Sequence, residues 1–207
     1  MGRPFLTEAA TEALTGAIKS VEARSSAEVV ITVRAESARY GHVGYVCGAA
    51  AAFALLAFLL YSPFDFSYWS LLLDPLIAGL LLGYGCWRVD ALRRLLTSTS
   101  AGRDAVLQAA RATFFAKGVR NTSGRTGVLV YISVLERRAE ILADSGVVTA
   151  VSDHAWTEAV GAVRGAVAAG EDGVAVARII EDLAEVLEPA LPRAEDDVNE
   201  LPDGVGE

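Results

Sequence analysis

The sequence has few of the residues on which nucleophilic catalysis and metal binding usually depend. It contains only 2 His and 2 Cys in 207 residues, and both cysteines, Cys47 and Cys86, lie in apolar runs. No Gly-x-Ser-x-Gly elbow, phosphate-binding lysine loop or paired-cysteine zinc motif is present. The signals for serine hydrolases, NTPases and zinc proteins are therefore missing. We expect His154, next to Asp153, to be a surface residue at a helix start rather than a base.

A basic stripe is also missing. The formal net charge is -8, which argues against a nucleic-acid partner, because nucleic-acid binding depends on clustered Lys and Arg. Part of the acidity is local, since residues 193–207 carry Glu195, Asp196, Asp197, Glu200, Asp203 and Glu207. This composition predicts a disordered acidic tail.

Two long apolar runs raise the mean hydropathy to +0.37. Residues 43–61, VGYVCGAAAAFALLAFLLY, carry no charge, and residues 70–89, SLLLDPLIAGLLLGYGCWRV, carry Asp74 near the start and Arg88 near the end. Each run is long enough to cross a bilayer as a helix. Two such runs separated by a short turn predict a transmembrane hairpin within residues 40–97, rather than two buried core helices. We expect no cleaved signal peptide, because charged, amphipathic sequence precedes the first run.

The distribution of arginines predicts the orientation of the hairpin. The turn at residues 62–69 has no Lys or Arg, whereas the outer flanks of the hairpin carry Arg34, Arg39, Arg88, Arg93, Arg94 and Arg103. The positive-inside rule therefore predicts a two-pass protein of the inner (cytoplasmic) membrane with both termini in the cytoplasm. Asp74 would lie near the outer end, where it can reach water or become protonated, and this is favoured over a role in proton relay. Cys47 and Cys86 would be neighbours at a reducing face, so we expect no disulfide.

The segments on either side of the hairpin, residues 1–39 and 98–192, have the patterns of one α/β domain. Strands are predicted at residues 27–34, 127–133 and 139–143, with amphipathic helices before and after them. Neither segment has enough strands to fold alone, so the two must assemble around the insertion. The predicted fold class is α/β, with a small mixed sheet covered by helices on both faces and interrupted by the hairpin after its first strand.

Four segments of the chain together resemble a known family. They are the strand AEVVITV, residues 114–147 (FFAKGVRNTSGRTGVLVYISVLERRAEILADSGV), a helix containing Trp156 and the segment GEDGVAVARIIEDLAEVL. The chain resembles the TPM-domain family over residues 5–37 and 103–192. That family includes a thylakoid photosystem II repair factor described as an acid phosphatase, an accessory subunit of a receptor channel, and many bacterial membrane proteins. The resemblance implies a three-layer α/β/α domain and, in some members, a bound divalent cation such as Ca²⁺.

Polar residues are expected to gather at one edge of the sheet if the first two strands are parallel and the third runs back: Glu28, Arg120, Asn121, Arg125, Thr126 and Asp144. A phosphate or acidic partner could bind Arg120 and Arg125, and Asp144 with Asp153 could hold hydrated Ca²⁺ or Mg²⁺. Alternatively, Arg125 and Asp144 form a structural ion pair. Family members usually have Asp where this chain has Asn121, whereas Asp153 matches the family's acidic position.

The charged cluster Glu136, Arg137 and Arg138 separates the second and third predicted strands. A turn between buried strands must be polar, so we expect a solvated tip. The alternative is contact with a partner or with anionic phospholipid, which attracts basic residues near a bilayer.

These observations favour a membrane-anchored TPM-domain protein that serves as a non-enzymatic binding or accessory factor for another membrane protein in assembly, repair or regulation. The competing hypothesis is a divalent-metal-dependent phosphatase acting on phosphoesters, which the family resemblance suggests. Transport of a small solute is a third hypothesis, but it requires oligomerisation because two helices cannot enclose a pore.

Overall fold

The computed structural model describes residues 5–38, 40–193, 199–201 and 204–206, and the chain divides into two compact units. One unit joins Met1–Ser37 to Arg103–Glu207, and the other is the continuous segment Ala38–Gly102. The first unit is therefore discontinuous in sequence, because the second is inserted after its first strand.

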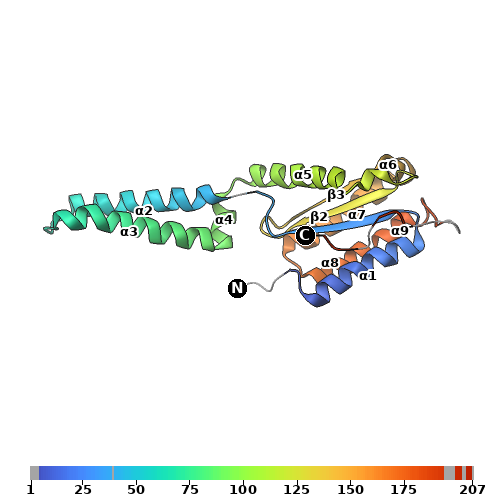
Figure 1. Cartoon of the computed structure of the whole chain (residues 1–207), viewed down its shortest axis with the longest axis horizontal. Coiled ribbons are helices and arrows are strands. Elements are labelled where there is room, and N and C mark those ends of the chain that lie inside the picture. The colour runs from blue at the N-terminus through green and yellow to red at the C-terminus, as the bar shows by residue number, and fades with distance from the viewer. Residues whose placement is uncertain (1–4, 39, 194–198, 202–203, 207) are drawn as a thin grey trace. The chain divides into compact units, whose positions relative to one another are not determined.

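A three-stranded mixed sheet forms the centre of the discontinuous unit (Figure 1). Its strands are β1 (Glu28–Arg34), β2 (Gly127–Ser133) and β3 (Arg138–Ala143), in the order β1-β2-β3. β1 is parallel to β2, and β3 is antiparallel to β2, so the sheet is mixed, as the sequence predicted. A parallel pair needs a long crossover, and here the crossover contains the whole inserted unit.

The larger part of the core lies on one face of the sheet. α1 (Glu8–Arg24), α7 (Asp153–Ala169), α8 (Gly173–Glu181) and α9 (Leu183–Leu187) pack there. Alternation along β1 directs Val29, Ile31 and Val33 to this face, where they join buried residues of the helices such as Leu14, Ile18, Val163, Ile180 and Leu187.

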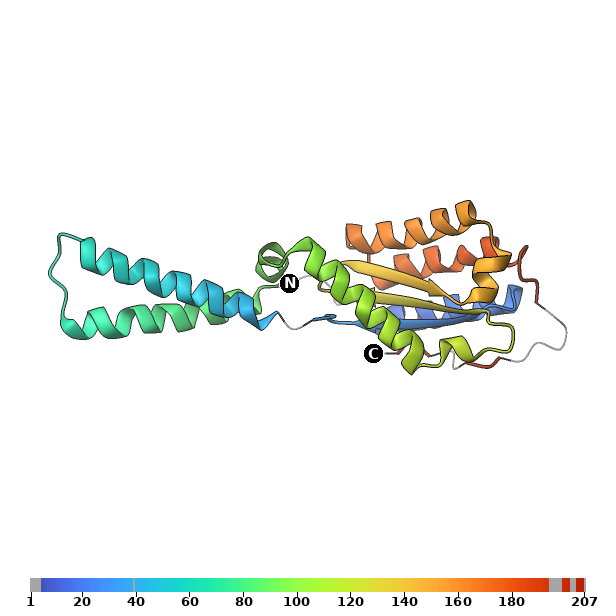
Figure 2. The same cartoon turned by 90° about the horizontal axis from the view of Figure 1, so that it is seen from above.

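A single helix, α5 (Thr99–Ala116), packs against the opposite face (Figure 2). Val106 and Ala110 of α5 contact a smaller cluster formed by Val30, Leu129 and Tyr131. Helices thus cover both faces, which confirms the predicted α/β architecture. α5 begins at Thr99, earlier than the start near residue 104 expected from the apolar spacing.

Side-chain caps explain where several helices begin. Thr7 Oγ1 accepts a hydrogen bond from the Ala10 amide at 3.1 Å, and Asp172 Oδ1 accepts one from the Ala175 amide at 2.9 Å. Ser152 caps α7 in the same way. Each cap satisfies an amide that has no partner within its own helix.

Three short helical segments were not predicted from the sequence. They are α4 (Asp90–Leu96), the 3₁₀ turn η1 (Val119–Asn121) and α6 (Ser145–Ala150). None is longer than two turns, so an amphipathic period has too few residues in which to show itself.

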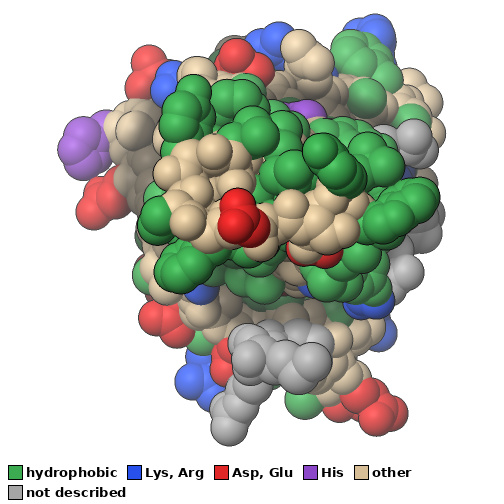
Figure 3. Space-filling model, turned by 90° about the vertical axis from the view of Figure 1, so that its left-hand side faces the viewer, with side chains coloured by type: hydrophobic (Ala, Val, Ile, Leu, Met, Phe, Trp, Pro, Cys, Tyr) green, Lys and Arg blue, Asp and Glu red, His purple; other side chains and the backbone are tan. Residues whose placement is uncertain are grey.

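The inserted unit contains the antiparallel pair α2 (Gly41–Tyr61) and α3 (Tyr68–Arg88), both long and apolar enough to cross a membrane. Gly44 and Gly48 of α2 face Gly79 and Gly83 of α3, so the two backbones approach closely. The large apolar side chains point away from this contact. Figure 3, which looks onto the end of the hairpin at its turn, shows hydrophobic side chains over much of that face.

Candidate functional site

Glu28, Thr126 and Asp144 lie at the same end of the sheet, as the sequence predicted. Glu28 is opposite Gly127 in the parallel pair, and its amide donates a hydrogen bond to the Thr126 carbonyl at 3.2 Å. The Asp144 amide donates to the Gly127 carbonyl at 2.9 Å. The start of β1, the start of β2 and the end of β3 therefore bring these three residues together.

Arg125 and Asp144 form an ion pair at this end, with 3.5 Å between Arg125 Nη1 and Asp144 Oδ2. The other carboxylate oxygen of Asp144 caps α6 by accepting a hydrogen bond from the Ser145 amide at 2.8 Å. Arg125 has φ 54°, in the left-handed region, and its side chain is half exposed. This geometry matches the structural ion pair considered as the alternative to a phosphate site.

Arg120 and Asn121 belong to η1, which follows α5. The Arg120 guanidinium lies over the ring of Phe115, 5.4 Å from its centroid, and Asn121 is exposed. Arg120 thus contacts an aromatic ring, whereas Asp144 pairs with Arg125. A two-arginine phosphate clamp of Arg120 and Arg125 remains a prediction that these contacts do not support.

The two predicted metal ligands, Asp144 and Asp153, have different surroundings in the structure. Both oxygens of Asp144 have protein partners, and Asp153 is exposed in the first turn of α7. Across the described ranges, no group of three or more His, Cys, Asp or Glu side chains could hold a metal ion. Ca²⁺ takes six to eight oxygen ligands, so these two carboxylates alone would not complete a Ca²⁺ site, and binding of a hydrated Mg²⁺ stays a prediction.

The sequence analysis did not foresee a second set of contacts at this end of the sheet. Glu28 is buried, and its carboxylate accepts hydrogen bonds from the amides of Glu200 and Leu201, both at 3.3 Å. Glu200 in turn accepts a hydrogen bond from the Ser123 amide at 2.8 Å. Hydrogen bonding by the hydroxyl and then the amide of Ser123 lowers the pKa of Glu200. For residues 199–201, the structure differs from the disordered tail that composition predicted.

The charged turn lies at the other end of the sheet, between β2 and β3. The Glu136 carboxylate accepts hydrogen bonds from the Ser37 amide at 2.9 Å and from the Ser133 hydroxyl. The Ser37 hydroxyl donates to Ser133 Oγ at 2.7 Å and lies 3.0 Å from the Tyr131 hydroxyl. Glu136 is therefore part of a half-buried polar network and not a solvated tip.

Arg137 and Arg138 differ from Glu136. Arg137 is exposed, with φ 49°, and Arg138 is half buried at the start of β3. A contact of these two residues with a partner or with lipid remains a prediction.

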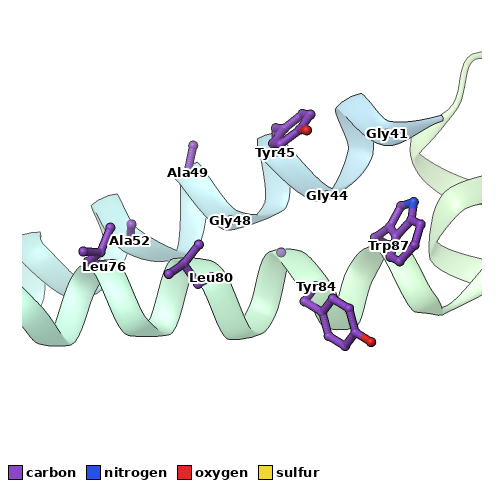
Figure 4. A pocket seen from close by; sticks show the side chains of 12 residues that line it. Gly41, Gly44, Tyr45, Gly48, Ala49, Ala52, Leu76, Leu80, Tyr84 and Trp87 are labelled. Atoms are coloured by element: carbon purple, nitrogen blue, oxygen red, sulfur yellow. The ribbon is translucent and has the colours of Figure 1, made fainter. Parts of the chain in front are cut away.

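A groove of about 590 Å³ runs along one side of the hairpin (Figure 4). Glycines of α2 and α3 contribute to its lining, together with Tyr45, Ala49, Leu76, Leu80, Tyr84 and Trp87. The Arg88 guanidinium lies near two of these rings, 5.2 Å from the Tyr84 centroid and 5.9 Å from that of Trp87. The groove is almost wholly apolar, which suits hydrocarbon better than a polar substrate.

No protein-family model matches the chain, and no curated protein matches it. Among solved structures, the chain is similar to the NMR structure of the BA42 protein from the psychrophilic bacterium Bizionia argentinensis, with a TM-score of 0.59 and 19% identity. The match covers 100% of this chain and 97% of that chain. At this level of identity the similarity shows a shared fold and nothing of function.

Proposed function

We propose that the chain is a membrane-anchored TPM-domain protein that acts as a non-enzymatic binding or accessory factor for another membrane protein. The observation that carries this proposal is the packing of the hairpin. Its helices meet through glycine, whereas large apolar side chains are exposed, among them Phe53, Leu72, Leu76, Leu80 and Leu81. Such a surface needs lipid or a membrane partner to cover it.

The α/β unit supports a binding role because its polar side chains already have structural tasks. Asp144 caps a helix and pairs with Arg125, and Glu136 accepts two hydrogen bonds. A general base must lie within hydrogen-bond reach of the substrate proton that it accepts, and a nucleophile needs such a base beside it. These carboxylates instead accept hydrogen bonds from protein groups. The anchor and the structural roles of these carboxylates both support recognition rather than catalysis.

Membrane fractionation combined with site-specific photocrosslinking tests the proposal. A photoreactive residue replaces Leu80, which is 67% exposed, and the matched control replaces Leu14, which is fully buried. The full chain should stay in carbonate-washed membranes, and the position at Leu80 should give one discrete protein adduct that the control lacks. Recovery of the chain in the soluble fraction, or lipid adducts alone from every outward position of α2 and α3, would contradict the proposal.

A phosphatase assay tests the competing hypothesis of a metal-dependent enzyme. The purified full chain is incubated with a generic phosphoester, with and without Ca²⁺ or Mg²⁺, alongside Asp144→Asn and Asp153→Asn. We expect no turnover above the background without protein. A cation-dependent activity that both substitutions abolish would establish the enzyme and overturn the preference for a binding role.

A further inference from the structure

The outer edge of β1 is covered by the chain's own C-terminal segment, here called the tail segment (residues 199–201 and 204–206). The Gly206 amide donates to the Ile31 carbonyl and the Val33 amide donates to the Gly206 carbonyl, both at 3.0 Å. These two bonds make a parallel β-bridge between Thr32 and Gly206. The edge therefore accepts an extended strand through its backbone, which is how sheet edges recognise peptides.

Side chains fix the rest of the tail segment on the domain. Leu201 packs against the cluster under α5, and Val205 packs against the larger core. Glu28 accepts the amides of Glu200 and Leu201, as described above. The edge thus offers two backbone hydrogen bonds at one bridge, an apolar contact at each end and a buried carboxylate that holds main-chain amides.

The end of this edge near Gly206 is cationic. A Cβ added at Gly206 would overlap the Lys117 ammonium group, so that group lies directly against the tail segment. Burial, and then the charge of Arg34, lower the pKa of Lys117. The Thr32 hydroxyl is buried beneath the same point, and its oxygen has no hydrogen-bond partner within the described part of the chain. Two cations and an unused hydroxyl suit an incoming carboxylate.

We propose that the edge of β1 is a docking site for an extended acidic segment of the membrane partner, which the tail segment occupies in its absence. The inference rests on the proposed function and names the surface through which it would act. Charge complementarity identifies the occupant. Residues 199–207 contain Glu200, Asp203 and Glu207 and no Lys or Arg, so this sequence is complementary in charge to Lys117 and Arg34.

A peptide-binding experiment tests this docking site. The probe is a fluorescent peptide of sequence NELPDGVGE, residues 199–207, and the protein is the full chain in lipid nanodiscs, measured by fluorescence polarisation. A variant lacking residues 199–207 should bind about tenfold more tightly than the wild-type chain, because the peptide no longer competes with a covalently attached strand. Gly206→Pro, which removes the amide that donates to Ile31, should give an intermediate gain. Gly204→Pro is the matched control, since a Cβ there meets nothing within 4 Å.

A charge exchange separates recognition from a structural effect. In the variant lacking residues 199–207, Lys117→Glu should weaken binding of the acidic peptide about tenfold. The same substitution should strengthen binding of a peptide in which the three acidic residues are Lys. Loss of a structural residue alone would weaken both.

Three results would overturn the docking site: equal binding by the wild-type and shortened chains, equal binding of a scrambled peptide, or failure of the shortened chain to fold. A tail segment that is required for folding is not a displaceable occupant. None of these outcomes would change the crosslinking result at Leu80. Failure of the docking site is therefore distinguishable from failure of the proposed function.

Discussion

Gly48 of α2 lies directly against Gly79 of α3. A Cβ added at Gly48 would lie 2.7 Å from the Gly79 carbonyl oxygen, and one added at Gly79 would lie 2.9 Å from the Gly48 carbonyl oxygen. Such distances leave no room for any side chain, so the two backbones are in contact. The same relationship recurs between Gly44 and Gly83. The pairing of the helices depends on these four positions.

Gly48→Leu should separate the two helices of the hairpin. The side chain has no space to enter, and overpacking of this kind costs about 1–3 kcal/mol. We expect a lower midpoint of thermal unfolding in detergent, followed by Trp fluorescence. Gly85→Leu is the control, because a Cβ at Gly85 meets nothing within 4 Å, and it should leave the midpoint nearly unchanged. Equal effects of the two substitutions would contradict the packing described for Gly48.

Asp144→Ala should destabilise the α/β unit more than Arg125→Ala. The first substitution removes the cap of α6 and costs about 1 kcal/mol, whereas the second removes only one side of a half-exposed ion pair and costs about 0.5 kcal/mol or less. Urea unfolding monitored by circular dichroism measures the difference. A larger loss from Arg125→Ala than from Asp144→Ala would show that the ion pair, and not the cap, is the main role of Asp144.

Arg137→Gly should stabilise the turn between β2 and β3. Arg137 has φ 49°, and a residue other than glycine in this region destabilises the fold by about 1–2 kcal/mol. Glycine removes this strain, but part of the gain is offset because glycine makes the unfolded chain more flexible. A net gain of about 0.5 kcal/mol in the free energy of unfolding is expected. Arg137→Ala, which keeps the backbone strain, is the control. A gain from alanine as large as that from glycine would assign the effect to the side chain.

Docking of residues 199–201 should weaken at acidic pH. The pKa of Glu200 is lowered by its hydrogen bonds to Ser123, so the attached state favours the ionised carboxylate. The stabilisation that ionised Glu200 gives to the attached state is fully present above pH 4.5, the ordinary pKa of a glutamate. It is lost as the pH falls through the lower pKa that Glu200 has in the attached state. The protection factor of the Ser123 amide against hydrogen exchange should therefore fall as the pH drops below 4.5. Glu200→Gln, whose side chain does not ionise, should show no such change.

The sequence predicted those strands and helices that show a clear run or spacing of apolar residues. β2 was expected at residues 127–133 because it is a continuous apolar run, and the structure places it at Gly127–Ser133. The gathering of Glu28, Thr126 and Asp144 was expected on the condition that the first two strands are parallel and the third runs back, and the structure meets that condition. The two apolar helices were visible because each run is long enough to cross a bilayer, with no charge in residues 43–61 and only Asp74 and Arg88 in residues 70–89.

The contacts that were missed join residues far apart in the sequence. Nothing local to Glu28 indicates that its carboxylate holds the amides of Glu200 and Leu201. The acidic composition of residues 193–207 predicted disorder, whereas Leu201 and Val205 supply enough apolar contact to attach the described part of that segment. Glu136 was expected to be solvated because a turn is usually polar, but the hydroxyl of Ser133 and the amide of Ser37 surround it.

The position of the inserted unit also constrains the order of events during synthesis. β1 leaves the ribosome before either hairpin helix, and its parallel partner β2 leaves only after both. The pairing of β1 with β2 therefore cannot form until the intervening segment has been synthesised. β1 therefore stays without its partner strand while the whole hairpin is synthesised, and an unpaired strand edge of this kind is prone to aggregation.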